Sequence, residues 1–335
     1  MNKFQPPFRQ SQIVDWMTCP RRFYFRHVLG LERDKISLAM FFGSVYHRAI
    51  ELIHQNTFTN LLDVIDAIEA ESIEPIAWGD RQADIEEWKP DAESILSHYW
   101  DKEFNRKAHI LHSEICFRVN VGPFPFVGRI DELRIENGLV LIDYKSGAVP
   151  DNQTFRDLDY QLSLYAYACA YGEFWHPLRD DTGKILMDDR RNYLMPTDAS
   201  AYFKIGGIPD RIAIYKLGDH LPYKRKTTKD GITYNVGDER GPARYWTTRT
   251  EADFEAMKRD LGFICRQIVG PHYGTKGLVR GGAFARTPIN FGGMQTCAMC
   301  PFQAECLADR SRPIAIDEQT ADEARIALAE VGITE

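Results

Sequence analysis

The chain has 335 residues, of which 44% are hydrophobic and 12% are aromatic. This composition supports a sizeable core and excludes a fibrous or disordered chain. The formal net charge of −7 argues against a surface that is basic throughout, although a local basic groove for nucleic acid stays compatible with it. No apolar run follows the N-terminal MNKFQPPFRQ, and no stretch reaches the roughly 18 apolar residues of a membrane span. We therefore expect a cytoplasmic protein without a membrane segment.

The N-terminal part of the chain has the apolar spacing of helices. Four helical segments are expected, over residues 11–18, 20–31, 43–54 and 61–107. Ser11 is the expected N-cap of the first helix, and Pro20 is well placed to open the second. Pro75 and Pro90 are expected to break the last segment, because proline removes a backbone donor from a helix.

The periodicity then changes to that of strands. Three strands are expected, over residues 113–119, 126–135 and 139–145. Asn137-Gly138 predicts a tight hairpin turn between the last two. Glu114, Cys116 and Arg118 alternate onto one face of the first strand. The third strand is apolar enough to be central and buried on both faces.

Helical spacing returns after the third strand. The later elements expected are a helix over 158–171, a strand over 211–217, a basic turn-rich loop over 223–231 and a helix over 250–269 with Thr250 as N-cap. We expect one domain over 1–310, made of a helical part (11–110), a sheet and helix (111–172), an insertion of unknown role (173–250) and a C-terminal helix with a cysteine loop (251–310), followed by a polar tail over 311–335.

The third strand presents a carboxylate and a lysine on one face. Asp143 and Lys145 point the same way as Leu141, because side chains alternate along a strand. A surface ion pair would account for these two alone, but Asp131 on the neighbouring strand can reach the same place. Oxygen ligands of this kind suit Mg²⁺ or Mn²⁺, which can bind a phosphate and activate a water, while a lysine steadies the growing charge. The pattern predicts a phosphodiesterase centre.

These residues resemble the PD-(D/E)XK nuclease superfamily, specifically its RecB-like branch. Asp131 matches the proline–aspartate position, although Ile130 replaces the proline, and Asp143-Tyr144-Lys145 matches (D/E)XK. The resemblance implies an α/β fold in which helices flank a central mixed β-sheet, with a helical N-terminal insertion. It also implies a metal-dependent DNA nuclease.

Two further motifs flank this centre. Gly43-Ser44-Val45-Tyr46-His47 resembles the G-x-x-x-H motif of that branch, and Gln161-Leu162-Ser163-Leu164-Tyr165 resembles its Q-x-x-x-Y motif. Taken singly, His47, Gln161 and Tyr165 are compatible with ordinary helix residues, and Glu114 with a solvated strand position. The resemblance implies that Mg²⁺ or Mn²⁺ is held by His47, Asp131, Asp143 and the backbone carbonyl of Tyr144, with Glu114 as a further carboxylate, and that the catalytic residues are Asp131, Asp143, Lys145, Gln161 and Tyr165.

The seven cysteines include a closely spaced trio. Cys297, Cys300 and Cys306 form C-x2-C-x5-C, which favours a metal or cluster site. Zinc with a distant fourth ligand is an alternative, and disulfides would be the reading in a secreted protein. Three other cysteines lie in apolar patterns typical of a core, namely Cys116, Cys169 and Cys265.

A fourth ligand comes only from the resemblance. Iron–sulfur members of the RecB-like branch, such as AddB-type and CRISPR-associated exonucleases, take one cysteine from far upstream. Cys19-Pro20-Arg21-Arg22-Phe23-Tyr24 resembles that motif. The resemblance therefore implies a [4Fe–4S] cluster on Cys19, Cys297, Cys300 and Cys306, a clasp that joins the two ends of the chain and stabilises the fold by closing a long loop.

The function implied is exonuclease cleavage of DNA with single-stranded or free ends, in recombination, repair or CRISPR adaptation, beside a helicase, recombinase or integrase. Basic residues expected to contact DNA are Arg21, Arg22, Lys224, Arg225 and Lys226. An iron–sulfur DNA-binding scaffold with an idle centre is the alternative, as is a nuclease that acts on RNA. The complete set of metal ligands disfavours the scaffold.

Overall fold

The computed structural model describes residues 7–31, 38–55, 82–102, 109–146, 152–181, 183, 185–188, 192–217, 223–231, 233–237, 244–269 and 300–308. They form two compact units. The core unit comprises the described residues from 7 to 13 and from 38 to 267, and the terminal unit comprises those of 14–31, 268–269 and 300–308. Pro75, Cys297 and the tail over 311–335 lie outside the described residues. Among the described residues, no helix is both long and apolar enough to cross a bilayer.

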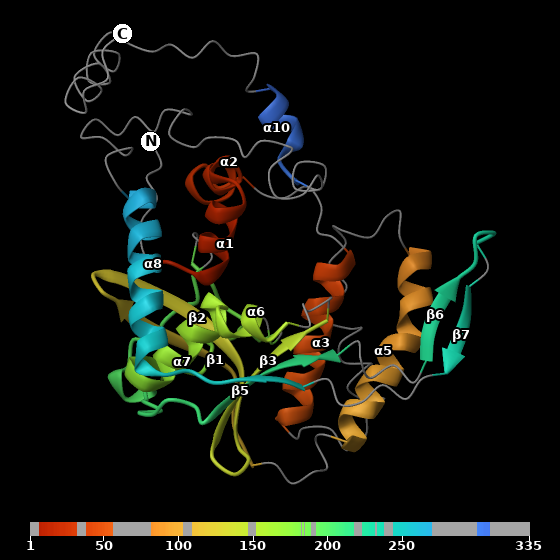
Figure 1. Cartoon of the computed structure of the whole chain (residues 1–335), viewed down its shortest axis with the longest axis horizontal. Helices are drawn as coiled ribbons and strands as arrows, with labels where there is room; N and C mark the ends of the chain where they lie inside the picture. Colours follow the sequence, from red (N-terminus) through yellow and green to blue (C-terminus); the bar gives the residue numbers. More distant parts are fainter. Residues whose placement is uncertain are drawn as a thin grey trace. The chain divides into compact units, whose positions relative to one another are not determined.

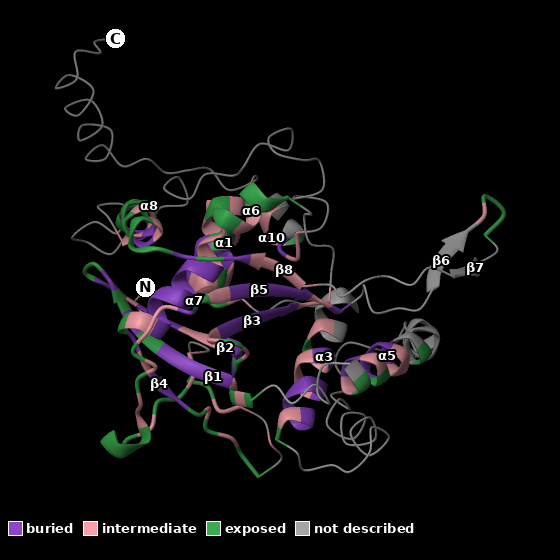
Figure 2. Cartoon of the chain, turned by 60° about the horizontal axis from the view of Figure 1, so that its bottom comes forward, coloured by how far each residue is buried: buried purple, intermediate pink, exposed green. Residues whose placement is uncertain are grey.

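A mixed six-stranded sheet forms the centre of the core unit, in the order β4-β1-β2-β3-β5-β8 (Figure 1). Its strands are β1 (His109–Val121), β2 (Phe124–Ile135), β3 (Leu139–Lys145), β4 (Glu173–Trp175), β5 (Arg211–Lys216) and β8 (Arg244–Thr247). The β3–β5 pair is parallel, and the other neighbouring pairs are antiparallel. Figure 2 shows β1, β2, β3 and β5 largely buried, which confirms the central position expected for the third strand. The expected α/β class with a mixed sheet is also confirmed.

The hairpin between β2 and β3 turns where the sequence predicts. Asn137 and Gly138 both have positive φ, of 53° and 117°. A side chain at position 138 would also collide with Asp210, since a Cβ there would lie 2.5 Å from Asp210 Oδ2. That oxygen accepts a hydrogen bond of 2.7 Å from the Leu139 N–H, so glycine is required for both conformation and space.

Helices cover both faces of this sheet. They are α3 (Leu38–His54), α5 (Gln82–Lys102), α6 (Gln153–Asp157), α7 (Tyr160–Tyr171) and α8 (Glu251–Val269). Ile142 and Tyr144 of β3 pack among the apolar residues of α3 and α5. Asp143, which lies between them, bonds instead to Gln161 of α7. Because successive strand residues face opposite ways, α7 lies on the other face from α3 and α5.

The expected start of the first helix and the expected break at Pro90 are both wrong. Helix α1 (Gln10–Thr18) begins before Ser11, and Gln12 Oε1 accepts a 2.7 Å hydrogen bond from the Arg9 N–H in place of a serine cap. Pro90 lies inside α5 and does not break it. The turns that follow Pro90 are anchored in the core, which compensates for the lost backbone bond, through Ala92, Ile95, Leu96 and Tyr99.

Other boundaries also differ from expectation. The helix expected over 20–31 is α2 (Pro20–Phe23) followed by a π-helix, Tyr24–Val28. Helix α3 begins at Leu38, before the expected start. Helix α7 begins at Tyr160 because the Asp159 carboxylate caps it and accepts from the next two backbone N–H groups.

The loop expected over 223–231 is instead half of a hairpin. Strands β6 (Tyr223–Thr227) and β7 (Thr233–Gly237) form a separate antiparallel pair. Its basic segment lacks the alternation of apolar residues that marks a half-buried strand, so the sequence gives little signal for it. The start of α8 is as predicted, since Thr250 precedes it and its N–H and hydroxyl both bond to Asp253 Oδ2 at 2.7 Å.

The terminal unit contains segments from both ends of the chain and a buried acid. Phe25 contacts Phe302, which immediately precedes α10 (Gln303–Ala308), and their ring centroids lie 5.9 Å apart. Asp15 is 2% exposed and lies within 2.9 Å of Arg22, 2.8 Å of Arg26 and 2.8 Å of His27. Burial raises the pKa of Asp15, but these cationic neighbours outweigh burial and hold the pKa below its usual value.

Replacing Asp15 with alanine should destabilise the terminal unit by about 3 kcal/mol, because removing one partner of a buried ion pair strands the others. The stabilisation is present at neutral pH and should fade as the pH falls below about 4, where the unfolded chain takes up the proton first. Urea unfolding at neutral pH measures the loss. Glu255→Ala is the control, because the Lys258–Glu255 pair lies on the surface. Equal stability of the two variants would contradict the role of Asp15.

Candidate active site

The site lies where β2 and β3 part. Their backbone pairing ends at Glu132 and Ile142, and Asp131 and Asp143 come immediately beyond it. The Tyr144 N–H donates a 2.8 Å hydrogen bond to Asp131 Oδ2 instead of to the backbone of β2. Both carboxylates are buried, Asp143 almost completely. The hairpin thus places two acids together in the interior.

Helix α3 and strand β1 bring two more ligand groups to Asp131. His47 Nδ1 lies 3.2 Å from Glu114 Oε1 and 3.4 Å from Asp131 Oδ1. One ligand atom from each of these three residues lies within 4.8 Å of the others, a spacing that could hold a metal ion. Glu114 has a φ of 51°, which is uncommon for a residue other than glycine. Backbone strain of this kind is concentrated at functional sites.

On the other side of Asp143, α7 supplies polar partners. Lys145 Nζ lies 2.8 Å from Asp143 Oδ2 and donates a 3.3 Å hydrogen bond to Gln161 Oε1. Gln161 Nε2 donates to Asp143 Oδ1 at 2.9 Å and to the Tyr165 hydroxyl at 2.8 Å. Gln161 therefore contacts the carboxylate, the lysine and the tyrosine at once.

A buried arginine fixes the beginning of α7. Arg249 Nε donates a 2.7 Å hydrogen bond to Ser163 Oγ, and its Nη2 donates to the Arg156 carbonyl at 2.6 Å and to the Asp159 carbonyl at 3.3 Å. One guanidinium thus ties the end of α6 to the first turn of α7. Because Gln161 lies in that turn, Arg249 holds it in position, although no motif in the sequence indicates this role.

The electrostatics of the site favour a cation. Burial opposes the charge of His47, but Asp131 and Glu114 hold its pKa well above the ordinary value. Burial also raises the pKa of Asp143 to about 6, and the charge of Asp131 adds to the rise. Burial raises the pKa of Glu114 as well. The raised pKa values of His47, Asp143 and Glu114 mean that these groups bind protons tightly. A metal ion that binds here would compete with those protons, as is usual at metal sites.

The ligand set also fits a divalent ion by its chemistry. Carboxylate oxygens and an imidazole suit Mg²⁺ or Mn²⁺. Within the described part of the chain, Glu114 Oε2 and Asp143 Oδ2 are buried oxygens that accept no hydrogen bond, although each has a cationic side chain nearby. A bound ion near these carboxylates would compensate their buried charge.

A second polar cluster lies on the opposite face of the same strands. The Tyr144 hydroxyl bonds to Glu132 and lies 2.9 Å from the Tyr99 hydroxyl, which is 2.6 Å from His54 Nε2. Glu132 also pairs with Arg134. Glu132 adjoins Asp131, and Tyr144 adjoins Asp143 and Lys145, so this buried cluster supports the site from the opposite face of the sheet. Its signal in the sequence is the polar Glu132 and Arg134 within an apolar strand.

The structure brings together seven side chains expected at the site, and Tyr144, whose carbonyl is the other expected ligand, lies between Asp143 and Lys145 in β3. The seven side chains are His47, Glu114, Asp131, Asp143, Lys145, Gln161 and Tyr165. The sequence did not indicate Arg129, whose Nε lies 2.7 Å from Glu114 Oε2.

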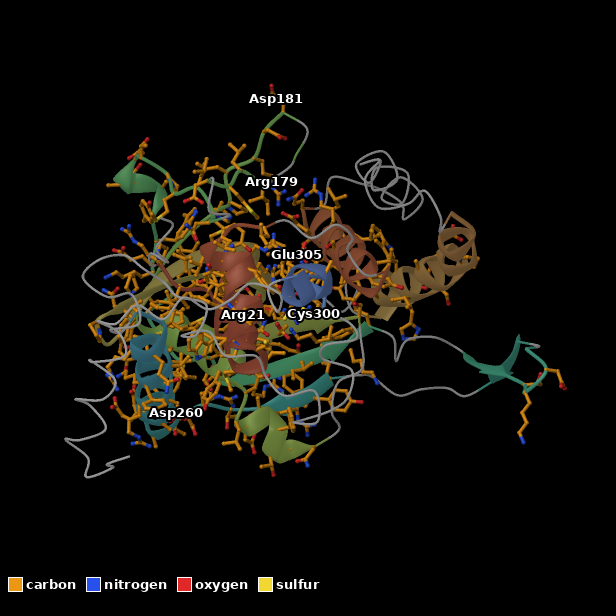
Figure 3. The ribbon with its side chains drawn as sticks, turned by 90° about the horizontal axis from the view of Figure 1, so that it is seen from above. Arg21, Arg179, Asp181, Asp260, Cys300 and Glu305 are labelled. Carbon is orange, nitrogen blue, oxygen red and sulfur yellow. The ribbon has the colours of Figure 1, made fainter. Side chains whose placement is uncertain are left out.

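Of the described cysteines, three belong to the terminal unit and three to the core unit. Those of the terminal unit are Cys19, Cys300 and Cys306, and burial raises the pKa of the Cys300 thiol. Figure 3 labels Cys300, which immediately precedes the turn into α10 (Gln303–Ala308). Three others are completely buried, which confirms them as core residues, namely Cys116, Cys169 and Cys265.

The residues expected to contact DNA have varied surroundings. Arg21 is buried, and its guanidinium lies 5.8 Å from the Tyr24 ring centroid. Arg22 pairs with Asp15. Both arginines therefore have partners inside the terminal unit. Three other basic residues belong to β6, where only the backbone is described, namely Lys224, Arg225 and Lys226.

Comparison with known proteins agrees with this geometry. The sequence model for the PD-(D/E)XK nuclease superfamily matches residues 8–307, nearly the whole chain. No curated protein matches the sequence.

Without metal, Asp143→Asn should stabilise the protein at pH 7.5, on the order of 2 kcal/mol, because asparagine resembles the protonated acid. The raised pKa means that the folded state binds this proton more tightly than the unfolded chain, so stability declines as the pH rises through about 6. Below about pH 4, where the folded and the unfolded chain both hold the proton, the variant and the wild type should differ little. Thermal melts with EDTA measure both, and Mn²⁺ should stabilise the wild type more. A variant less stable at pH 7.5 would contradict this account.

Proposed function

Because the chain belongs to the PD-(D/E)XK nuclease superfamily, whose members are metal-dependent nucleases, we propose that it is an exonuclease acting on DNA with single-stranded or free ends. The observation that carries this proposal is the buried carboxylate pair, Asp131 and Asp143, with Lys145 beside it. An idle scaffold would have no need to keep these charges out of water. RNA as substrate is an outcome of the test below.

In this proposal, His47, Asp131, Asp143 and the Tyr144 carbonyl hold Mg²⁺ or Mn²⁺. When bound, such an ion binds phosphate oxygen and lowers the pKa of a coordinated water. Burial opposes the charge of Lys145, but Asp143 and Asp131 raise its pKa, so the lysine stays cationic and can stabilise charge on the phosphate.

Helix α7 serves that lysine. Gln161 bonds to both Lys145 and Asp143, which limits the positions open to the ammonium group. Burial raises the pKa of Tyr165 well above the ordinary range, so its hydroxyl stays neutral. It accepts from Gln161 and fixes the orientation of that amide. Both residues act here by orienting the charged groups.

Lys145→Ala should lower cleavage of end-labelled DNA in Mn²⁺ at least about 100-fold, because the phosphate charge loses its stabilising cation. Asp143→Ala should do the same by removing a metal ligand. Lys258→Ala is the matched control, a surface lysine paired with Glu255.

Single-stranded DNA, double-stranded DNA and RNA are compared in this assay, with the sizes of the products. Shortening from labelled ends supports the exonuclease, and internal cuts or cleavage of RNA alone would contradict it. Undiminished cleavage by Lys145→Ala and Asp143→Ala would contradict the assignment of the centre.

We further propose that the chain belongs to the RecB-like branch and carries a [4Fe–4S] cluster on Cys19, Cys297, Cys300 and Cys306. Cys19, Cys300 and Cys306 belong to the same compact unit although they come from opposite ends of the chain, which supports it. Thiolates in such sets are the usual ligands of iron–sulfur clusters. The cluster would then act as a clasp between the two ends of the chain.

Anaerobically purified protein should be brown, and Cys300→Ser should lose the broad visible absorption and much of its stability. Cys265→Ser is the matched control, because Cys265 is completely buried in the core unit and should leave the colour intact. Absorption spectra with iron and sulfide analysis measure this. A colourless protein with stoichiometric zinc would rule out the cluster.

DNA contact by Lys224, Arg225 and Lys226 is proposed from their place together on β6, since adjacent positive charges attract the phosphate backbone. Cytoplasmic location, a role in recombination, repair or CRISPR adaptation, and a helicase, recombinase or integrase partner stay predictions from the resemblance.

A further inference from the structure

A pocket of about 380 Å³ adjoins the candidate metal centre. Two of its lining residues, His47 and Glu114, belong to that centre. The other lining residues include three arginines, namely Arg48 of α3, Arg129 of β2 and Arg179 of the insertion after β4 (Figure 3 labels Arg179). Residues from three separate parts of the core unit therefore present guanidinium groups to one space beside the site.

Two buried carboxylates hold these arginines in place. Glu51, 4% exposed, accepts a 2.8 Å hydrogen bond from Arg48 Nη1 and another from Arg179 Nη2. Glu114 pairs with Arg129 Nε at 2.7 Å, and burial of Arg129 is outweighed by this carboxylate, which raises the arginine pKa. The two carboxylates thus orient all three guanidinium groups.

The charges in the pocket do not cancel. Three arginines face two carboxylates, and Glu114 is shared with the metal centre. A guanidinium has five N–H donors, and Arg179 bonds to Glu51 through Nη2 and to the Gly183 carbonyl through Nη1. Planar donor forks of this kind match the oxygens of a phosphate. One arginine would suffice to neutralise Glu51, yet Arg179 reaches the same carboxylate from a distant segment.

We propose that this pocket, named here the arginine pocket, binds the phosphate next to the scissile one in a nucleic-acid strand. The inference rests on the proposed nuclease function. The pocket shares Glu114 and His47 with the metal centre. A phosphate bound in the pocket would therefore be a neighbour, along the nucleic-acid strand, of the phosphate that is cleaved. The insertion, which carries no motif, thereby gains a substrate-binding residue in Arg179.

The first test uses the wild type and DNA altered at one phosphate at a time. Single-stranded oligonucleotides, each with one neutral methylphosphonate linkage, are titrated with protein in Ca²⁺, and their cleavage is then followed in Mn²⁺. Loss of the flanking charge should weaken binding at least about tenfold, the effect of one charge-assisted hydrogen bond. Uniformly small effects at all flanking positions would overturn the proposal.

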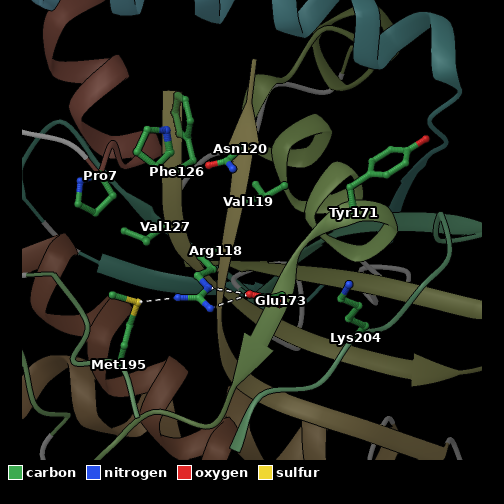
Figure 4. A pocket seen from close by; sticks show the side chains of 11 residues that line it. Pro7, Arg118, Val119, Asn120, Phe126, Val127, Tyr171, Glu173, Met195 and Lys204 are labelled. Atoms are coloured by element: carbon green, nitrogen blue, oxygen red, sulfur yellow. Dashed lines mark hydrogen bonds and ion pairs between the residues drawn. The ribbon is translucent and has the colours of Figure 1, made fainter. Parts of the chain in front are cut away.

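The second test asks whether Arg179 binds that phosphate. Arg179→Gln should weaken binding of unmodified DNA at least about tenfold. In this variant, the methylphosphonate should weaken DNA binding further by less than about twofold, because the arginine that the phosphate contacts is already absent. The matched control is Arg118→Gln, because Arg118 also pairs with a glutamate, Glu173, at 2.8 Å, but lines a separate pocket (Figure 4). Equal effects of the two substitutions would overturn the assignment.

Failure of the nuclease proposal gives a different result. A wild type that binds DNA in Ca²⁺ but does not cleave it in Mn²⁺ contradicts nuclease activity, while the phosphate scan still tests the arginine pocket. If the wild type cleaves DNA, but Arg179→Gln binds every oligonucleotide as tightly as the wild type does, the arginine pocket is contradicted and the nuclease function is not. Arg179→Lys keeps the positive charge and should bind DNA more tightly than Arg179→Gln. This recovery would show that the lost charge, and not misfolding, weakens binding in the glutamine variant.

Discussion

The Asp131 and Asp143 carboxylates lie together in the interior, at the point where the β2–β3 ladder ends. Two buried negative charges at such a place are unfavourable unless cations and donors surround them. Lys145 and the Tyr144 N–H supply part of that compensation, and His47 approaches from α3. The rest of the core unit can be understood as the framework that assembles these groups around one carboxylate pair.

The site is supported from both faces of β3, because successive strand residues point to opposite faces of the sheet. Asp143 and Lys145 face α7, whose Gln161 bonds to both. Tyr144, between them, faces the other way and joins the buried cluster with Glu132. The site is therefore supported by hydrogen bonds on both faces of β3, which restricts the movement of the residues that would hold an ion.

Much of this could be predicted from the sequence because the signals are local. Alternation located the strands, and the Asn137-Gly138 turn set the hairpin that opposes Asp131 to Asp143. The ordered motifs then identified His47 and Gln161, which the fold brings to the same place.

Features that depend on distant contacts could not be predicted in this way. The left-handed backbone of Glu114 arises in the middle of an ordinary strand pattern, and Arg129 is recognisable only by its contact with that glutamate. Arg249 acts through backbone carbonyls about ninety residues away, which leave no trace in local periodicity. Pro90 is a case where packing of later turns overrides a local breaker.

The most direct test of the central claim is a crystal structure of the protein soaked in Mn²⁺, with anomalous diffraction recorded to locate the metal. One strong peak is expected within coordination distance of the Asp131 and Asp143 carboxylates and of the His47 imidazole. Crystals that contain Mn²⁺ at other positions, with these carboxylates neutralised by protein side chains alone, would contradict the central claim.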